Sequence, residues 1–233
     1  MYRPYSRIFI SLQHLIYNKN RMVKLIKFVF NTFMVNTYLL YDESGECILI
    51  DAACYDTEEQ EELKECIKVN NLTLVRNLNT HCHIDHILGN DFIARIYGIY
   101  PEYHKNSMPF FHTLEEIGAS FGYTINQIPA PKRFLTDNEI VHWGNSALKV
   151  FFTPGHADGS VCFYNEDQGF VITGDVLFKD TIGRTDLPSG DFDQLMRSIK
   201  TKLFTLPENT IVYPGHGSET SIGYEMENNP FIR

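Results

Sequence analysis

The sequence predicts an α/β fold, and three observations lead to that assignment. Runs rich in β-branched and aromatic residues open the chain, between positions 23 and 50. Apolar residues at helical spacing follow within 56–69 and 86–97, with a short apolar run between them. Strand-like runs return from position 140 and are followed by a further helix and a last strand. Strands and helices therefore alternate through both halves of the chain, as they do in mixed α/β domains.

The first half is expected to begin with antiparallel sheet. Residues 42–45, Asp-Glu-Ser-Gly, lie between two strand-like runs and predict a hairpin. The segment 56–69 starts with acidic residues, which suit a helix N-terminus. A later helix is expected to stop at Gly98. The predicted elements are strands at 23–30, 37–41, 47–50 and 74–78, and helices at 56–69, 86–97 and 107–121.

The second half is expected to contain another set of strands and one helix. Asp191 is a suitable cap for that helix, because its carboxylate can accept hydrogen bonds from the first free backbone N–H groups. The last strand leads into Pro214 and Gly215. The predicted elements are strands at 140–143, 148–152, 160–164, 170–173 and 210–213, and a helix at 191–203.

Composition argues against nucleic-acid binding and against a membrane-spanning helix. The 233-residue chain carries a formal net charge of −9, so it lacks the basic field that binds nucleic-acid phosphates. No stretch approaches about 18 uninterrupted apolar residues, which argues against a membrane-spanning helix. The 5 cysteines are odd in number and show no C-x-x-C spacing, which favours reduced thiols and a cytoplasmic location.

Residues 1–21 differ from the rest of the chain. They contain basic residues and no acid, with a short apolar patch that Gln13 and His14 interrupt. A secretory signal would show a longer apolar core and a small-residue cleavage site. We expect 1–21 to be a basic extension that is not native or is disordered, with Met22 as the true start and 22–233 as the functional domain. The alternative is a basic surface-binding arm.

Residues 81–86, His-Cys-His-Ile-Asp-His, indicate a metal site. They place three imidazoles and a carboxylate directly behind a predicted buried strand. Cys82 lies between two of the candidate ligands, but a neighbouring residue in an extended segment points away from them. We therefore expect Cys82 to be a small buried side chain.

Three further strands end in glycine- or proline-marked turns that present a ligand residue. A buried strand brings the chain to the sheet edge, and the turn lets the next side chain face a common point. Together with the hexapeptide this makes five histidines and two aspartates, too many for one tetrahedral ion that keeps an open position. Two divalent ions fit better, and nitrogen with carboxylate donors suits Zn²⁺ as well as Fe or Mn. These turns are Thr153-Pro154-Gly155-His156, Thr173-Gly174-Asp175 and Tyr213-Pro214-Gly215-His216.

The order of these motifs resembles that of the metallo-β-lactamase fold hydrolases, and within them the short, single-domain, glyoxalase II-like (hydroxyacylglutathione hydrolase-like) branch. The resemblance covers essentially 22–233. It implies a four-layer αββα sandwich of two mixed sheets, with the site along the edge between the sheets. The segments that carry it are T-H-C-H-I-D-H, T-P-G-H, T-G-D and Y-P-G-H-G, with 178–188, Gly223-Tyr224-Glu225 and Asn229-Pro230-Phe231 as more local likenesses.

The resemblance also implies a ligand set. Asp51, at the end of a predicted strand, would support a ligand histidine by accepting a hydrogen bond from its other ring nitrogen. A carboxylate that merely closes a strand is the alternative for Asp51. The other histidines, His14, His104, His112 and His142, match no ligand position. In the implied set His81, His83 and His156 bind one ion, Asp85, His86 and His216 bind the second, and Asp175 bridges the two.

Such a pair of cations would lower the pKa of a shared water and supply a metal-bridging hydroxide near neutral pH. Asp85 would aim this nucleophile and carry its proton. The chain has no G-x-S-x-G nucleophile elbow, and a thiolate, with a reference pKa of about 8.5, leaves without acid help. Thioester cleavage is therefore the natural reaction, and the resemblance implies S-D-lactoylglutathione or a related 2-hydroxyacyl thioester.

His86 in the last position of the motif makes a β-lactam substrate unfavoured, since the commonest true β-lactamases resemble H-x-H-x-D-R. The longer glyoxalase II enzymes have a C-terminal domain with basic residues for glutathione, whereas this sequence ends soon after His216. Arg184 matches a substrate-contacting position, and Lys179 is a weaker partner. A loop ion pair of Arg184 with Asp180 or Asp186 is the alternative.

Three other functions stay open. Persulfide dioxygenases resemble this ligand pattern but use one Fe and O₂. A lactonase or phosphodiesterase of the same fold would cleave oxygen esters faster than thioesters. A metal-binding scaffold with a decayed site is the non-enzymatic alternative.

Overall fold

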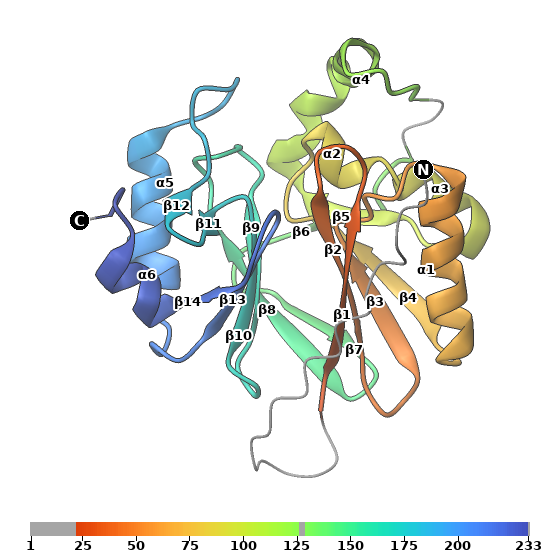
Figure 1. Cartoon of the computed structure of the whole chain (residues 1–233), viewed down its shortest axis with the longest axis horizontal. Helices are drawn as coiled ribbons and strands as arrows, with labels where there is room; N and C mark the ends of the chain where they lie inside the picture. The colour runs from red at the N-terminus through yellow and green to blue at the C-terminus, as the bar shows by residue number, and fades with distance from the viewer. Residues whose placement is uncertain (1–21, 126–128, 233) are drawn as a thin grey trace, which may run out of the picture.

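The computed structural model describes residues 22–125 and 129–232. Two six-stranded sheets face each other, and helices cover the outer face of each sheet (Figure 1). The arrangement is the four-layer sandwich that the sequence resemblance implied. The predicted extension 1–21 lies outside the described residues.

The first sheet has the order β1-β2-β3-β4-β5-β6. Strands β1, β2 and β3 pair antiparallel, which confirms the predicted hairpin, and β3 to β6 pair parallel. Parallel strands end at one edge, so the segments that follow β3 and β4 leave the sheet side by side. The strands are β1 (Lys24–Phe30), β2 (Val35–Tyr41), β3 (Glu46–Ile50), β4 (Thr73–Leu78), β5 (Pro101–His104) and β6 (Arg133–Leu135).

The second sheet has the order β14-β13-β10-β9-β8-β7. The neighbouring strands β10 and β13 pair parallel, so the segments after both strands reach the same edge. A small separate hairpin of β11 (Leu177–Phe178) and β12 (Thr181–Ile182) follows β10. The strands of the sheet are β7 (Ile140–Trp143), β8 (Ser146–Phe152), β9 (Val161–Asn165), β10 (Phe170–Gly174), β13 (Ile211–Pro214) and β14 (Thr220–Ser221).

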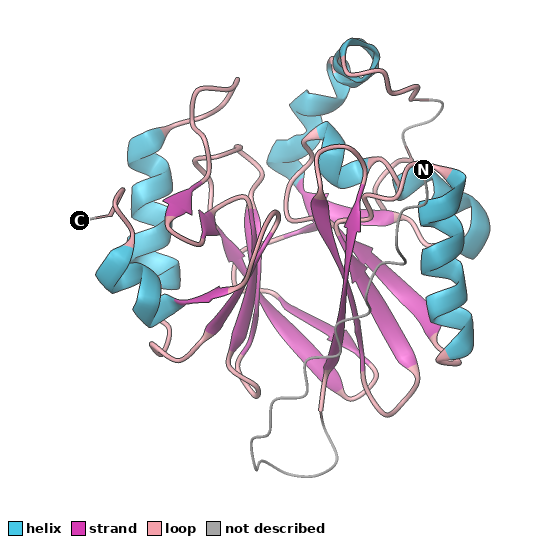
Figure 2. Cartoon of the chain, in the orientation of Figure 1, coloured by secondary structure: helices cyan, strands magenta, loops and turns pink. Residues whose placement is uncertain are grey.

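Helices connect the strands and flank the sheets (Figure 2). Asp191 caps its helix as the sequence predicts, and Asp56 caps the helix that follows it; each accepts from a backbone N–H in the first turn. In the described part of the chain no helix is long and apolar enough to cross a membrane. The helices are α1 (Thr57–Val69), α2 (Ile84–Ile87), α3 (Asn90–Tyr97), the 3₁₀ helix η1 (Lys105–His112), α4 (Leu114–Ser120), α5 (Phe192–Ser198) with its π-helical continuation η2 (Ile199–Leu203), and α6 (Ile222–Asn228).

Two predicted helices are interrupted. The helix predicted over 86–97 divides into α2 and α3 at Gly89, whose N–H donates to the Ala52 carbonyl at 2.8 Å. A Cβ at Gly89 would lie 2.7 Å from the Cys54 sulfur, so the helix break packs directly on the segment after β3. The helix predicted over 107–121 begins instead as η1, which contains Pro109, and Pro has no N–H to continue an α-helix.

The continuous apolar run of β3 is explained by burial on both faces. Ile48 and Ile50 point into the core between the sheets, while Cys47 and Leu49 point into the core beneath α1 and α3. A strand covered on both sides reads as an unbroken apolar run rather than an alternating one. The strand is thereby fixed rigidly, and so is the residue that follows it, Asp51.

The reactivity of the cysteine thiols can test this packing. All 5 are free thiols, and only Cys66 is partly exposed, whereas Cys47, Cys54, Cys82 and Cys162 are buried. Burial raises the pKa of Cys47, Cys54 and Cys162 to about 12.

We expect Ellman's reagent to label one thiol of the native protein quickly and all five in guanidinium. Cys66→Ser should abolish the fast phase, and two or more fast thiols in the native protein would contradict this packing.

Candidate metal centre

The hexapeptide lies where β4 leaves the first sheet. Its residues run from the loop after β4 into the first turn of α2, so that Asp85 stands at a helix N-terminus. His81 and His86 are almost fully buried, at 1% and 0% exposure. Cys82 packs in an apolar cluster with Ile84 and Ile87, away from the ligand residues. The loop thus separates its polar side chains from its apolar ones.

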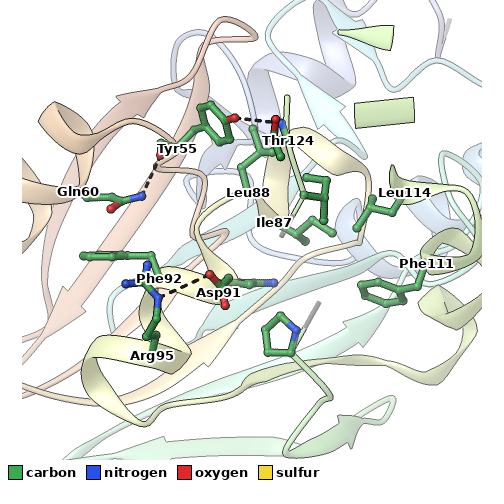
Figure 3. A pocket seen from close by; sticks show the side chains of 13 residues that line it. Tyr55, Gln60, Ile87, Leu88, Asp91, Phe92, Arg95, Phe111, Leu114 and Thr124 are labelled. Carbon is green, nitrogen blue, oxygen red and sulfur yellow. Dashed lines mark hydrogen bonds and ion pairs between the residues drawn. The ribbon is translucent and has the colours of Figure 1, made fainter. Parts of the chain in front are cut away.

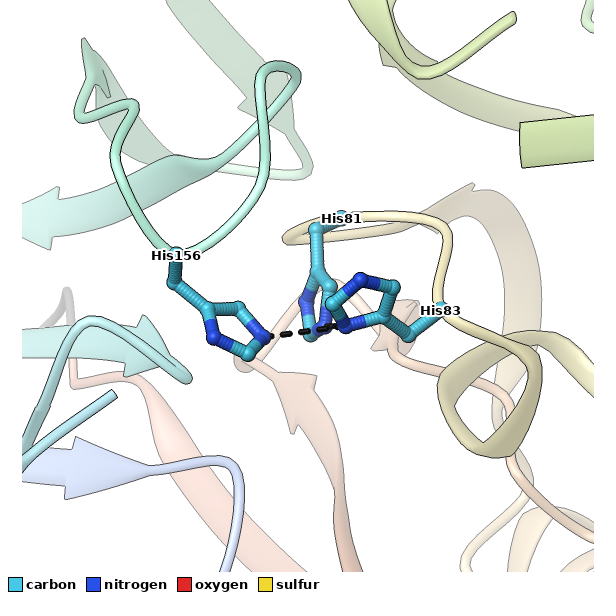
Figure 4. Close-up of side chains that lie close together, drawn as sticks. All are labelled: His81, His83 and His156. Atoms are coloured by element: carbon cyan, nitrogen blue, oxygen red, sulfur yellow. Dashed lines mark hydrogen bonds between the residues drawn. The ribbon is translucent and has the colours of Figure 1, made fainter. Parts of the chain in front are cut away.

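His81, His83 and His156 form one group of possible ligands, and their ligand atoms all lie within 4.8 Å of one another. Figure 4 shows the three rings converging from two different loops. The Nδ1 atom of His83 lies 3.1 Å from Nε2 of His81 and 3.0 Å from Nε2 of His156. His156 comes from the turn after β8, in the other sheet, so the two sheets share this group.

Asp85, His86 and His216 form a second group with the same spacing. The Nε2 atom of His216 lies 3.3 Å from a carboxylate oxygen of Asp85, and Nε2 of His86 lies 3.6 Å from the same oxygen. His216 follows β13, so this group also combines residues of both sheets.

Asp175 lies between the two groups. One of its oxygens is 3.3 Å from Nε2 of His86, and the other is 3.7 Å from Nε2 of His156 and 3.6 Å from Nε2 of His216. Its carboxylate therefore faces members of both groups at once. The structure brings together all seven residues that the sequence analysis selected as metal ligands.

Four of the five imidazoles give their remaining ring nitrogen to an acceptor. A ring that donates its Nδ1–H in this way keeps an unprotonated Nε2 for the cluster, the tautomer that a metal ligand needs. Asp51 contacts His86, at the place where the sequence analysis expected a carboxylate that supports a ligand histidine, and the other three partners were not anticipated. The four contacts are His81 to the Thr80 hydroxyl at 3.1 Å, His86 to Asp51 at 2.9 Å, His156 to the Arg184 carbonyl at 2.8 Å and His216 to the Phe33 carbonyl at 3.0 Å.

Burial controls the charge of the first group. It lowers the pKa of His81, and it lowers that of His83 to about 4, with a further contribution from the nearby His156. Both rings are therefore neutral at physiological pH. Neutral imidazoles are the form that binds a metal ion, so no proton has to leave these two rings first.

Carboxylates control the charge of His86. Burial opposes its protonation, but Asp175, Asp85 and Asp51 outweigh burial and raise the pKa of His86 well above its usual value. In turn, burial disfavours the ionised form of Asp175, and His86 overcomes this and lowers the pKa of Asp175 far below its usual range. The anionic carboxylates thus stabilise a positive charge at His86. A bound cation would supply this charge in place of a proton.

Two buried atoms show where a cation fits. Nε2 of His86 and one oxygen of Asp175 are both buried and have no hydrogen-bond partner among the described residues. They face each other at 3.3 Å. Buried polar atoms in native proteins are normally satisfied by a hydrogen bond or an ion. The donor set of nitrogens and carboxylates therefore fits divalent metals such as Zn²⁺, Fe and Mn.

A groove runs beside the second group. Its volume is about 340 Å³, and it lies between the β11–β12 hairpin and the loop that begins with His216. Lys179 lines it, with its ammonium 5.8 Å above the Tyr224 ring. The lining residues are Phe178, Lys179, Thr181, Ile182, His216, Gly217 and Ser218.

Arg184 is held in an ion pair. Its exposed guanidinium donates two hydrogen bonds to Asp186, at 2.8 and 2.7 Å. Of the two loop partners considered for Arg184, the structure selects Asp186. The backbone of Arg184 meanwhile touches His156, so the residue stands beside the first group even though its side chain points to the surface.

Other features lie apart from these seven residues. A cavity of about 100 Å³ between α2, α3 and α4 is lined by residues such as Ile87 and Leu114, and by none of the seven (Figure 3). His104 stacks on Phe152 at 4.1 Å and belongs to no ligand group. His112 and His142 likewise lie in none of the described groups, and His14 falls outside the described residues.

Comparison with known proteins assigns the family. A family model described as the metallo-beta-lactamase superfamily matches residues 30–216, most of the chain. The chain belongs to the metallo-β-lactamase superfamily. The family and the fold that the sequence resemblance implied are thereby confirmed, and the chain is a metallo-hydrolase of this superfamily.

Three known proteins are similar to this chain over most of its length. The hydroxyacylglutathione hydrolase GloC of Haemophilus influenzae is 34% identical over 206 residues, which cover 86% of this chain and 93% of GloC. The crystal structure of the B3 metallo-β-lactamase BLEG-1 has a TM-score of 0.78 and 35% identity, covering 91% of this chain and 99% of that one. TTHA1623, solved in a di-iron-bound form, has a TM-score of 0.78 and 31% identity, covering 88% and 98%.

A substitution at Gly215 can test the packing of the candidate metal centre. A Cβ at Gly215 would collide with an oxygen of Asp175 and lie 2.8 Å from Cε1 of His86. We expect Gly215→Ala to displace both side chains, so that the purified variant contains less metal per chain and loses most hydrolytic activity. Metal analysis and circular dichroism would measure metal content and fold.

Gly217→Ala is the matched control for this substitution. A Cβ there meets nothing within 4 Å, although its φ of 74° adds a strain of about 1 kcal/mol. An equal loss of metal in the two variants would show that a general disturbance of this loop, rather than the collision with Asp175 and His86, is responsible.

Proposed function

We propose that this chain is a two-metal hydrolase that cleaves a thioester, with S-D-lactoylglutathione or a related 2-hydroxyacyl thioester as the favoured substrate. The observation that supports it best is the position of Asp175, whose two oxygens face members of both ligand groups. Under this proposal His81, His83 and His156 would hold one ion, Asp85, His86 and His216 would hold the other, and Asp175 would serve both. Zn²⁺ is the favoured metal, and Fe or Mn fits the same donors.

Divalent ions in such a site lower the pKa of a bound water toward neutrality and polarise a substrate carbonyl. The chain's own residues then have to aim the nucleophile and take up its proton. Asp85 is placed for this, because its carboxylate is ionised and is 15% exposed on the side chain, at the edge of the cluster. Burial disfavours the ionised form of Asp85, but the neighbouring His86 and His216 lower its pKa below the usual value.

The ease with which a thiolate leaves favours a thioester as the substrate. A thiolate, with a reference pKa of about 8.5, departs without a proton donor, whereas an amine needs one. The similarity to GloC, named a hydroxyacylglutathione hydrolase, supports the same class of substrate. The groove beside His216, lined by Phe178 and Lys179 among others, is the proposed place for the substrate.

We further propose that the partner is a small thioester, with glutathione as one candidate for its thiol part. The net charge of −9 does not suit a nucleic acid. Five free thiols support a reducing, cytoplasmic location for the protein.

A second candidate is a persulfide dioxygenase with a single Fe. One observation favours it: His81, His86 and Asp175 form a third group with ligand atoms within 4.8 Å of one another. Two imidazoles and one carboxylate are the donor set of many mononuclear iron oxygenases. A lactonase or phosphodiesterase of the same fold remains a third candidate.

One activity panel with metal analysis separates these candidates. Protein of measured Zn, Fe and Mn content would be assayed with S-D-lactoylglutathione, a generic thioester, a lactone, a phosphodiester and a β-lactam, in air and without O₂. The proposal expects about two ions per chain and fastest cleavage of the thioesters, unchanged without O₂. One Fe per chain with O₂ uptake on glutathione persulfide would overturn it, as would faster cleavage of any other substrate.

Asp85→Asn tests the role of the carboxylate. The amide preserves the size of the side chain but cannot carry the nucleophile's proton, and it binds a cation less well. We expect kcat to fall by about 10² or more, a range typical of general acid–base groups, with the fold retained. Asp167→Asn, in an exposed turn of the second sheet, is the control and should leave kcat unchanged. Near-normal turnover of Asp85→Asn would refute the assigned role.

Arg184→Ala tests substrate binding. Because the main-chain carbonyl that accepts from His156 is retained, the ligand cluster should be unaffected. If the guanidinium holds an anionic part of the substrate, KM should rise several-fold while kcat stays nearly constant. Arg197→Ala, an exposed arginine on α5, serves as the control. An unchanged KM would mean that Arg184 only pairs with Asp186.

A further inference from the structure

The turn between β1 and β2 lies against the second ligand group. This turn, residues 31–34, begins and ends with non-glycine residues of positive φ, Asn31 at 54° and Met34 at 60°. The N–H of Met34 donates to the Asn31 carbonyl at 3.2 Å, which closes the turn. The sequence analysis assigned no role to it. Its contacts, however, reach two of the three residues in the second group.

Asn36, just after the turn, holds the backbone on both sides of His216. Its side chain is almost fully buried, and its amide donates to the carbonyls of Pro214 at 2.9 Å and Gly217 at 3.0 Å. Its own N–H donates to the Gly215 carbonyl at 2.7 Å. Three hydrogen bonds from one residue therefore fix the loop that carries His216.

Asn31 holds the other side of the group. Its amide donates to the carbonyls of Asp85 at 2.9 Å and Ala53 at 3.1 Å. Its side-chain oxygen accepts from the Phe33 N–H at 2.9 Å, and the Phe33 carbonyl in turn accepts from Nδ1 of His216 at 3.0 Å. The same side chain thus connects the backbone of Asp85 with the ring orientation of His216.

Both positions need the chemistry of asparagine. Each side chain donates two hydrogen bonds to main-chain carbonyls, which a neutral amide can do and a carboxylate cannot. Asn31 also adopts a left-handed backbone that asparagine tolerates better than most residues. Loss of the Asn31 amide would leave the carbonyls of Asp85 and Ala53 without these donors. Loss of the Asn36 amide would do the same to the carbonyls of Pro214 and Gly217, which flank the segment of His216.

The first group is supported differently. The remaining ring nitrogens of His81 and His156 bond to Thr80 and to the Arg184 carbonyl, and no described hydrogen bond joins that group to the β1–β2 turn. Both groups share the support of Asp51, but among the described hydrogen bonds the β1–β2 turn reaches only the second group. A change in the turn should reach Asp85 and His216 and leave the first group in place.

We propose that Asn31 and Asn36 are positioning residues that set the affinity of the second group, Asp85, His86 and His216, for its metal ion. They thereby determine whether the chain holds two ions or one. This inference rests on the two-metal arrangement of the proposed function, but it does not depend on which substrate is cleaved. Loss of an outer hydrogen-bonding partner commonly weakens metal binding by about 10- to 100-fold, and we expect a loss of that size for the second ion alone.

The test uses Asn31→Gly and Asn36→Ala in the full chain. Glycine keeps the positive φ of position 31, so this variant removes only the side chain and keeps the test valid if Asn36→Ala folds poorly. Asn165→Ala is the matched control, because Asn165 is also a buried asparagine whose amide donates to a carbonyl, that of Ala147 at 3.1 Å, but it lies away from the seven residues. Circular dichroism and melting of the chelator-treated proteins would report the fold.

Zn²⁺ would be titrated into each metal-free protein against a competing chelator, with bound zinc measured per chain. The inference expects two ions for the parent and for Asn165→Ala, and in both turn variants an unchanged first ion with a second Kd raised about 10- to 100-fold. Parent-like binding of both ions by the turn variants would overturn it, as would an equal weakening of both ions or a parent that binds only one. A parent that binds two ions but cleaves no thioester would refute the proposed function and leave this inference standing.

Discussion

The buried carboxylate of Asp51 is the contact on which the site depends. It stands at the end of β3 with 1% exposure and a φ of 54°, a backbone conformation that turns the chain sharply at the sheet edge. One oxygen accepts from the Thr80 N–H at 2.7 Å, and the other accepts from the Thr80 hydroxyl at 2.7 Å and from His86 at 2.9 Å. A single side chain therefore joins the ends of two parallel strands and orients one ligand ring from each ligand group, His86 directly and His81 through Thr80.

The second sheet completes the centre by close approach of backbone. Gly174 adopts a φ of 50°, and a Cβ there would collide with Thr80, so the turn that carries Asp175 packs directly on the loop that carries His81. The N–H of Gly215 donates to the Gly174 carbonyl at 2.8 Å, which holds the His216 loop against the Asp175 turn. The candidate ligands are thus fixed by strand ends and glycine contacts between the layers, and three carboxylates, those of Asp51, Asp85 and Asp175, lie around His86.

Much of this could be predicted from the sequence, because the ligand residues follow apolar strands directly and are marked by turns. His156, Asp175 and His216 were found in that way. Elements without such a signature were missed: β5 begins at Pro101 and contains no β-branched residue, although it is buried throughout. The outer supports were missed for another reason. The carbonyls of Phe33 and Arg184 are main-chain groups that every residue possesses, so only the fold shows that they orient His216 and His156.

The central claim is that the fold creates two adjoining cation sites that share Asp175. Anomalous diffraction from crystals loaded with saturating Zn²⁺, recorded at the zinc edge, tests it most directly. We predict two peaks, one beside His81, His83 and His156 and one beside Asp85, His86 and His216, each in contact with the Asp175 carboxylate. A single peak, or a second peak away from these residues, would contradict the claim.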